Sequence, residues 1–206
     1  NLAQDLSLVG SGSPTPTPSP TTAPVPSPTV TLTPSPTNTP SPTPTPPTSI
    51  VQNGGFEDGQ APWQESSSGG YQIIQNLNAH SGANSAYLCG YPGCVDRISQ
   101  TFTVPANYTK LTITYWWYSD TNKNTRQCLD IFNSRLQTTS GQLIANLQQS
   151  CNTSVTNNWV IETFDVSRLL ASYKGKQVVL FFQGTNVNNQ YQPTDFFVDD
   201  VAIMAQ

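Results

Sequence analysis

Basic residues are scarce in this chain. Its 206 residues include 8 Lys and Arg against 12 Asp and Glu, which gives a formal net charge of -4. Proteins that bind nucleic acid gather Lys and Arg into a surface that neutralises phosphates. The composition therefore predicts no nucleic-acid partner. No apolar run approaches the roughly 20 residues that cross a bilayer, so we also expect no membrane insertion.

Histidine is almost absent, which removes most routes to catalysis. The only one, His80, stands in Ala79-His80-Ser81-Gly82, a tight-turn sequence, and hydrolysis by Ser or Cys needs a histidine base beside the nucleophile. Glycoside hydrolysis needs two carboxyl groups that face one cleft, but the acids are scattered without a recognisable motif. Asp96, next to Arg97, is interpreted as half of a surface pair. We therefore expect a protein that is not an enzyme.

Cysteine is rare but even in number, with four residues. Cys89 and Cys94 bracket a Gly-Tyr-Pro-Gly turn, which predicts a disulfide between them and leaves Cys128 to pair with Cys151. A zinc site is the alternative, although the spacing lacks two CxxC pairs. Disulfides indicate an extracellular or cell-surface protein, and because the sequence starts at Asn1 without Met or signal sequence, we expect a processed mature chain.

The first 49 residues are dominated by Pro, Thr and Ser. In the stalk, residues 14–49, almost every second or third residue from Pro14 to Pro47 is proline, which excludes helix and sheet and predicts an extended polyproline II conformation. Such a composition is typical of O-glycosylated stalks, and two N-glycosylation patterns follow later in the chain. The predicted sugar-bearing residues are Thr15, Thr17, Thr43 and Thr45 in the stalk, and Asn107 and Asn152 beyond it.

A short segment, residues 1–13, precedes the stalk. In it Leu2, Leu6 and Leu8 fall on one side of an alternating pattern, which indicates a single strand. A strand cannot be stable alone, so it would add to a sheet of its own domain or of a neighbouring molecule. The alternative is a frayed tail.

The remainder, residues 50–206, has the size of one domain and an all-β composition. Runs rich in Val, Ile, Thr, Phe, Tyr and Trp alternate with Asn, Gly and Ser clusters, which is typical of strands and turns. Only residues 166–174 show a helical pattern, for about two turns.

Successive segments of this region follow the order of a known fold. They are residues 51–59 followed by Trp63, then 80–82 leading to 85–88, then 98–105, 111–118, 158–159, 178–184 and 196–203. This pattern resembles carbohydrate-binding modules with the galactose-binding-like fold. The resemblance implies an antiparallel β-sandwich jelly roll, with residues 51–59 as its first strand region, but it fixes the ligand poorly.

Aromatic residues are the candidates for ligand contact. In residues 111–118 one face of the strand is apolar, while the other is polar except for Trp116 and Tyr118. Flat aromatic rings stack on sugars, so we predict a platform at these two residues, with the loop tyrosines Tyr91 and Tyr191 as further contacts. The alternative is that both rings pack beneath a loop or against the second sheet.

The resemblance also implies a structural calcium ion that ties the start of the domain to its last strand. The matching acids are Glu57 and one of Asp199 or Asp200, because neighbouring residues on a strand point to opposite faces.

Two functions fit these observations. The first, which we favour from the sequence, is a non-catalytic structural subunit that assembles with copies of itself into an extracellular filament or coat. The second is a module that binds polysaccharide through exposed aromatic side chains. A sugar-binding groove would favour the second, and contacts between copies through the stalk would favour the first.

Overall fold

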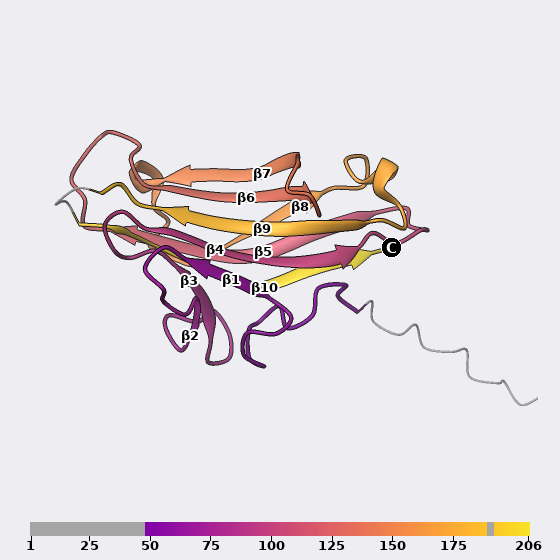
Figure 1. Ribbon diagram of the computed structural model, residues 1–206, viewed down its shortest axis with the longest axis horizontal. Coiled ribbons are helices and arrows are strands. Elements are labelled where there is room, and N and C mark those ends of the chain that lie inside the picture. Colours follow the sequence, from indigo (N-terminus) through magenta and orange to yellow (C-terminus); the bar gives the residue numbers. More distant parts are fainter. Residues whose placement is uncertain (1–47, 189–191) are drawn as a thin grey trace, which may run out of the picture. The chain divides into compact units, whose positions relative to one another are not determined.

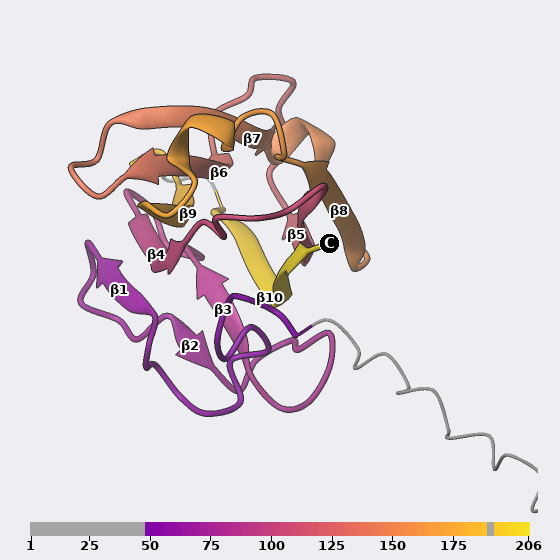
Figure 2. The same cartoon turned by 90° about the vertical axis from the view of Figure 1, so that its right-hand side faces the viewer.

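The computed structural model describes residues 48–188 and 192–206, which form a sandwich of two five-stranded antiparallel sheets (Figures 1 and 2). The order in one sheet is β1-β4-β9-β6-β7, and in the other β2-β3-β10-β5-β8. The elements are β1 (Gln64–Ser67), β2 (Ile74–Gln75), β3 (Ser85–Leu88), β4 (Val95–Thr103), β5 (Leu111–Thr121), β6 (Ile131–Thr138), β7 (Leu143–Cys151), η1 (Asn152–Ser154), β8 (Val160–Asp165), η2 (Ala171–Tyr173), β9 (Gln177–Thr185) and β10 (Thr194–Ala205).

The two sheets enclose one apolar core, and Figure 2 shows them end-on as two layers. Strand β5 alternates between buried and half-buried residues over residues 111–120, as its sequence predicts. Its inward Tyr115 lies edge-on to Phe182 of the opposite sheet, with ring centroids 4.9 Å apart. The Tyr115 hydroxyl donates to Gln148 Oε1 at 2.6 Å, so its polar atom is satisfied inside the core. The all-β sandwich is therefore confirmed.

Two local expectations are wrong. Residues 51–59 form turns rather than a strand, because Asn53 and Phe56 have φ values of 49° and 60°, in the left-handed region. The helix expected over residues 166–174 is reduced to one turn, in which Leu170 N donates to Val166 O at 3.0 Å, followed by the short 3₁₀ helix η2. Within residues 48–188 and 192–206, no helix is long and apolar enough to cross a bilayer.

Strand β10 carries a bulge that positions the predicted metal ligands. Its pairing with β5 shifts register between Asp199 and Ala202, and Asp200 adopts φ 47°. Within this bulge, Val201 N donates to Gly54 O at 2.9 Å, which ties the start of the domain to its last strand. A regular strand would send Asp199 and Asp200 to opposite faces, and the bulge cancels that alternation.

Candidate carbohydrate-binding face

The outer face of the second sheet carries a continuous series of rings. Tyr87 of β3 stacks on Phe197 of β10, with centroids 4.6 Å apart and planes 9° apart. Phe197 in turn contacts Tyr118 of β5 at 5.8 Å, and Tyr118 contacts Trp159 at 5.9 Å. The rings meet because β3, β10 and β5 are neighbours in the sheet, so their outward positions fall side by side.

A pocket of about 380 Å³ opens along part of this series. Three rings and two acids line it, and the loop before β3 forms its edge. The lining residues are Leu77, Asn78, Tyr87, Tyr118, Asp120, Asp195 and Phe197. We call this the Tyr118 pocket. Apolar ring faces beside carboxylates, an amide and phenol hydroxyls suit a ligand that is flat, hydroxylated and uncharged.

The two acids of the Tyr118 pocket face each other across paired strands. Asp195 of β10 is the register partner of Asp120 of β5. The Tyr87 hydroxyl donates to Asp195, and the Tyr118 hydroxyl donates to Asp120 Oδ2 at 3.0 Å. Burial raises the pKa of Asp195, and the negative charge of Asp120 raises it further, while the Tyr87 hydrogen bond lowers it. Burial, followed by the neighbouring carboxylates, raises the pKa values of both tyrosines, which keeps their hydroxyls as donors.

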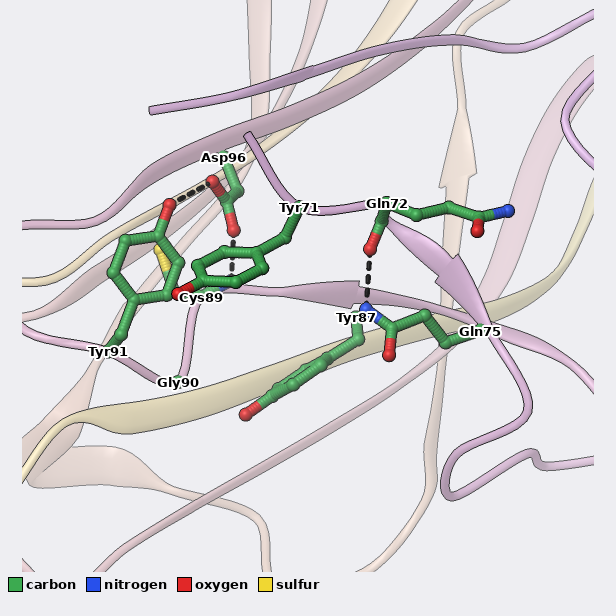
Figure 3. Close-up of a pocket in the computed structure, with 8 residues that line it drawn as sticks. All are labelled: Tyr71, Gln72, Gln75, Tyr87, Cys89, Gly90, Tyr91 and Asp96. Carbon is green, nitrogen blue, oxygen red and sulfur yellow. Dashed lines mark hydrogen bonds between the residues drawn. The ribbon is translucent and has the colours of Figure 1, made fainter. Parts of the chain in front are cut away.

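A second pocket, of about 290 Å³, shares Tyr87 with the first (Figure 3). Its lining residues are Tyr71, Gln72, Gln75, Tyr87, Cys89, Gly90, Tyr91 and Asp96. We call it the Tyr91 pocket. Tyr71 and Tyr91 meet edge to face with centroids 5.1 Å apart. The Tyr91 hydroxyl donates to Asp96 Oδ1 at 2.7 Å, and Asp96 Oδ2 accepts from Cys89 N at 3.1 Å. Asp96 is thus buried beneath the pocket, so its interpretation as a surface residue is wrong.

The structure places the four predicted ligand residues in different surroundings. Tyr118 and Tyr91 each line a pocket. Trp116 lies on the same face as Tyr118, but the His80 imidazole stacks on its indole at 3.9 Å. One face of the Trp116 ring is therefore covered by protein. Tyr191 lies outside the described residues, as do the assembly residues and the stalk threonines: Leu2, Leu6, Leu8, Thr15, Thr17, Thr43 and Thr45.

The three predicted calcium ligands gather around the loop of residues 80–84. Glu57 Oε1 accepts from Ala83 N at 2.9 Å and from Asn84 N at 2.8 Å. Asp199 Oδ2 accepts from His80 N at 2.8 Å. Burial, the largest cause, raises the pKa of Asp199 to about 6.

Asp200 reaches the same loop, so both aspartates point to it, and the expected alternation of their side chains to opposite faces does not hold. Asp200 Oδ2 lies 2.6 Å from His80 Nδ1, and Ser81 Oγ donates to Asp200 Oδ1 at 2.8 Å. Among the residues with described positions, Glu57, Asp199 and Asp200 form no ion pair with Lys or Arg. Carboxylate oxygens are the donors that calcium prefers, so the donor chemistry of this loop fits the ion. The carboxylate oxygens are not grouped around one point, since each bonds to the loop.

All four cysteines are in disulfides, Cys89–Cys94 and Cys128–Cys151, as predicted. The zinc alternative therefore has no thiolate ligand left. Asn107 is exposed. Asn152 is buried, and its Nδ2 donates to Gln127 O at 2.9 Å, so a glycan on Asn152 is incompatible with this fold.

Sequence reasoning missed Tyr87, Phe197 and the acid pair. Tyr87 and Phe197 are outward residues of segments that were predicted as strands, so their alternation with the buried Leu88 and Phe196 was a usable signal. The meeting of Asp120 with Asp195 depends on which strands pair and in what register, and no local pattern reports that.

Comparisons with known proteins agree with this architecture. No protein-family model and no curated protein matches the sequence. Among solved structures, the carbohydrate-binding module TmCBM61, in complex with β-1,4-galactotriose, is similar at 13% identity and TM-score 0.55, over 77% of this chain and 99% of that one. The K3 cleaved adhesin domain of Lys-gingipain from Porphyromonas gingivalis W83 is similar at 14% identity and TM-score 0.51, over 75% and 99%.

A third similar structure is an enzyme, the enzymatically active domain of bacteriophage CBA120 tailspike protein 4. The identity is 14% and the TM-score 0.48, over 77% of this chain but 21% of that one, which is too distant to carry an argument. At these identities the likenesses concern the fold alone. Residues 48–188 and 192–206 have the β-sandwich fold found in carbohydrate-binding modules.

Proposed function

We propose that this chain is an extracellular, non-catalytic module that binds a neutral polysaccharide in the Tyr118 pocket. The observation that carries the proposal is the grouping of Tyr87, Phe197 and Tyr118 with two carboxylates in one hollow of about 380 Å³. Ring faces stack on the apolar faces of sugar rings, and carboxylates and phenols exchange hydrogen bonds with sugar hydroxyls. The two disulfides support an oxidising compartment.

The charge of the pocket supports a ligand without acidic groups. Asp120 and Asp195 line it, and no Lys or Arg is among its described lining residues. A uronic acid or a sulfated sugar would place a negative charge beside this pair in a partly desolvated site. A neutral sugar places a hydroxyl donor there instead. We therefore infer preference for neutral over anionic polysaccharides.

The same two acids raise hydrolysis as a second candidate, and their arrangement argues against it. Hydrolytic carboxyl groups flank the scissile bond from opposite sides, about 5 Å or more apart. Asp120 and Asp195 are directly opposed residues of adjacent strands, and burial, followed by the interaction with Asp120, raises the pKa of Asp195. They present one acidic surface on one side of a ligand. Binding without cleavage is the function that this arrangement favours.

The favoured interpretation from the sequence, a filament subunit, loses its support. It depended on residues 1–13 and on the stalk, which lie outside the described residues. The comparisons concern the sandwich and favour the other interpretation, polysaccharide binding.

Affinity gel electrophoresis of the full chain tests the proposal. Native gels would contain β-1,4-galactan, xylan, mixed-linkage β-glucan, galactoglucomannan or, as the anionic control, polygalacturonate. We expect retardation by at least one neutral polymer, none by polygalacturonate, and loss of retardation in Tyr118→Ala. Leu143→Ala is a matched control, because Leu143 is 51% exposed on β7 of the other sheet. Mobility that no neutral polymer changes contradicts polysaccharide binding, and release of reducing sugar contradicts the non-catalytic part.

A further inference from the structure

Tyr87 is the common wall of the Tyr118 and Tyr91 pockets. One face of its ring is stacked on Phe197, and its hydroxyl donates to Asp195 of the Tyr118 pocket. Gly90, which lines the Tyr91 pocket, lies at the hydroxyl end of this ring, where a Cβ atom would be 1.7 Å from Tyr87 Oη and 2.7 Å from Asp195 Oδ1. A side chain at position 90 would disturb both pockets.

The Tyr91 pocket has the parts of a sugar subsite of its own. Tyr71 is 61% exposed, and its edge-to-face contact is with Tyr91. Gln72 and Gln75 also line the pocket, and the Gln75 side-chain amide donates to the Gln72 backbone oxygen at 2.5 Å (Figure 3). An exposed ring with amides nearby offers a stacking surface and hydrogen-bonding groups for hydroxyls.

The Tyr91 side chain is held rigidly in place. Its hydroxyl lies 3.0 Å from Ser67 Oγ, accepts from Gly69 N at 2.8 Å and donates to Asp96 Oδ1 at 2.7 Å. The Cys89–Cys94 disulfide closes the loop that carries it. A side chain fixed in this way loses little conformational entropy when a ligand binds. The preorganisation indicates a surface suited to binding.

We propose that the Tyr91 pocket is a second subsite for the same polysaccharide, and that one chain crosses the edge of Tyr87 and occupies both pockets. This inference rests on the proposed function. Pockets of about 290 and 380 Å³ are each near the lower end of the range for ligand sites, so neither accommodates a long oligosaccharide alone. A polysaccharide repeats its unit along a line, so adjacent pockets of similar chemistry take successive units. The Tyr118 pocket, which adds two carboxylates to its rings, is the primary subsite.

Isothermal titration calorimetry of the full chain tests the second subsite. The probes are β-1,4-linked galacto-, xylo- and gluco-oligosaccharides from disaccharide to hexasaccharide. In the series that binds, we expect affinity to rise with length. We expect Tyr71→Ala to weaken hexasaccharide binding roughly fivefold or more and to leave disaccharide binding unchanged. Tyr118→Ala weakens both, and Leu143→Ala weakens neither. Circular dichroism before and after heating checks that each variant is folded.

The outcomes separate this inference from the proposed function. Affinity that does not depend on length, or a folded Tyr71→Ala protein with unchanged hexasaccharide affinity, overturns the second subsite and leaves polysaccharide binding at the Tyr118 pocket intact. A wild-type chain that binds no oligosaccharide and no polymer overturns both.

Discussion

The His80 imidazole lies flat on the Trp116 indole, with ring centroids 3.9 Å apart and planes 15° apart. The same imidazole lies edge-on to Trp159 at 5.6 Å, and its Nδ1 is 2.6 Å from Asp200 Oδ2. One residue of a predicted turn therefore connects the outer aromatic face to the bulge of β10. On the covered face of its indole, Trp116 supports the loop of residues 80–84.

The first prediction concerns that support. His80→Ala removes a stacked ring and a hydrogen bond, so we expect a loss of about 1–2 kcal/mol in the free energy of unfolding, measured by urea denaturation. His80→Phe keeps a flat ring and should recover part of the loss. Trp116→Ala should destabilise the fold while changing polysaccharide retardation less than Tyr118→Ala. A stable Trp116→Ala protein that no longer binds sugar would show that Trp116 is a ligand residue after all.

The sequence predicted the sandwich well because alternation is a local property. Residues 111–118 specify by themselves which side chains face the core, and β5 follows that pattern. The alternation of Asp199 and Asp200 failed because a bulge with Asp200 at φ 47° interrupts β10, and a single strand's sequence does not reveal where its partner's register shifts. Both pockets escaped prediction for a related reason: each is assembled from segments far apart in the chain. Tyr118 and Tyr91 were found as aromatics, but Tyr87, which connects their pockets, resembled any strand residue.

The second prediction concerns a buried ion pair. Lys123 Nζ lies 2.6 Å from Asp130 Oδ2, and their side chains are 1% and 0% exposed. Asp130 also accepts from Val187 N at 3.0 Å and from Thr194 Oγ1 at 2.8 Å, so it joins three segments at one end of the sandwich. Lys123→Met leaves this carboxylate buried beside an apolar side chain, which should cost about 3–5 kcal/mol in chemical denaturation.

The control for Lys123→Met is Lys110→Met, at an exposed position, where we expect a change within about 0.5 kcal/mol. Equal effects of the two substitutions would mean that the Lys123–Asp130 pair contributes nothing specific.

The third prediction compares two aspartates whose pKa values shift in opposite directions. The pKa of Asp195 is raised above 3.8, chiefly by burial, so its ionisation weakens the folded state as pH rises from about 4. The pKa of Asp165 is lowered, chiefly by its hydrogen bond from Ser167, so its stabilising contribution is present above 3.8 and is lost as pH falls through the folded pKa. The stability of Asp195→Asn relative to wild type should rise as the pH increases from about 3 to 7. The stability of Asp165→Asn relative to wild type should fall over the same range. Thermal unfolding across this range measures both differences, and slopes of the same sign would refute the assignment.

The fourth prediction concerns calcium, which we propose as a structural ion held by Glu57 and Asp200 beside the loop of residues 80–84. Binding requires the two carboxylates to turn from the loop donors toward a shared ion. A Cβ atom at Gly55 would lie 3.3 Å from Asp200 Oδ1 and 4.0 Å from Glu57 Cγ, so the two side chains already share one neighbour. We expect CaCl2 to raise the melting temperature, EDTA to lower it, and Glu57→Gln to abolish the difference. Identical melting temperatures in CaCl2 and EDTA would contradict the proposed calcium site.

The fifth prediction separates the two disulfides by what each one holds. Cys128–Cys151 joins residues 23 apart and closes the segment that contains β6 and β7, so replacing both cysteines with Ala should cost about 3 kcal/mol of stability without altering sugar affinity. Cys89–Cys94 joins residues 5 apart and forms the loop of the Tyr91 pocket. Its removal should weaken hexasaccharide binding more than disaccharide binding, since Gly90 and Tyr91 are then less well fixed.

Calorimetry and denaturation on both double variants provide the comparison, with each variant as the other's control. If the Cys128/Cys151 variant loses long-chain affinity as strongly as the Cys89/Cys94 variant, the effect is one of general stability and the disulfide loop has no particular part in binding.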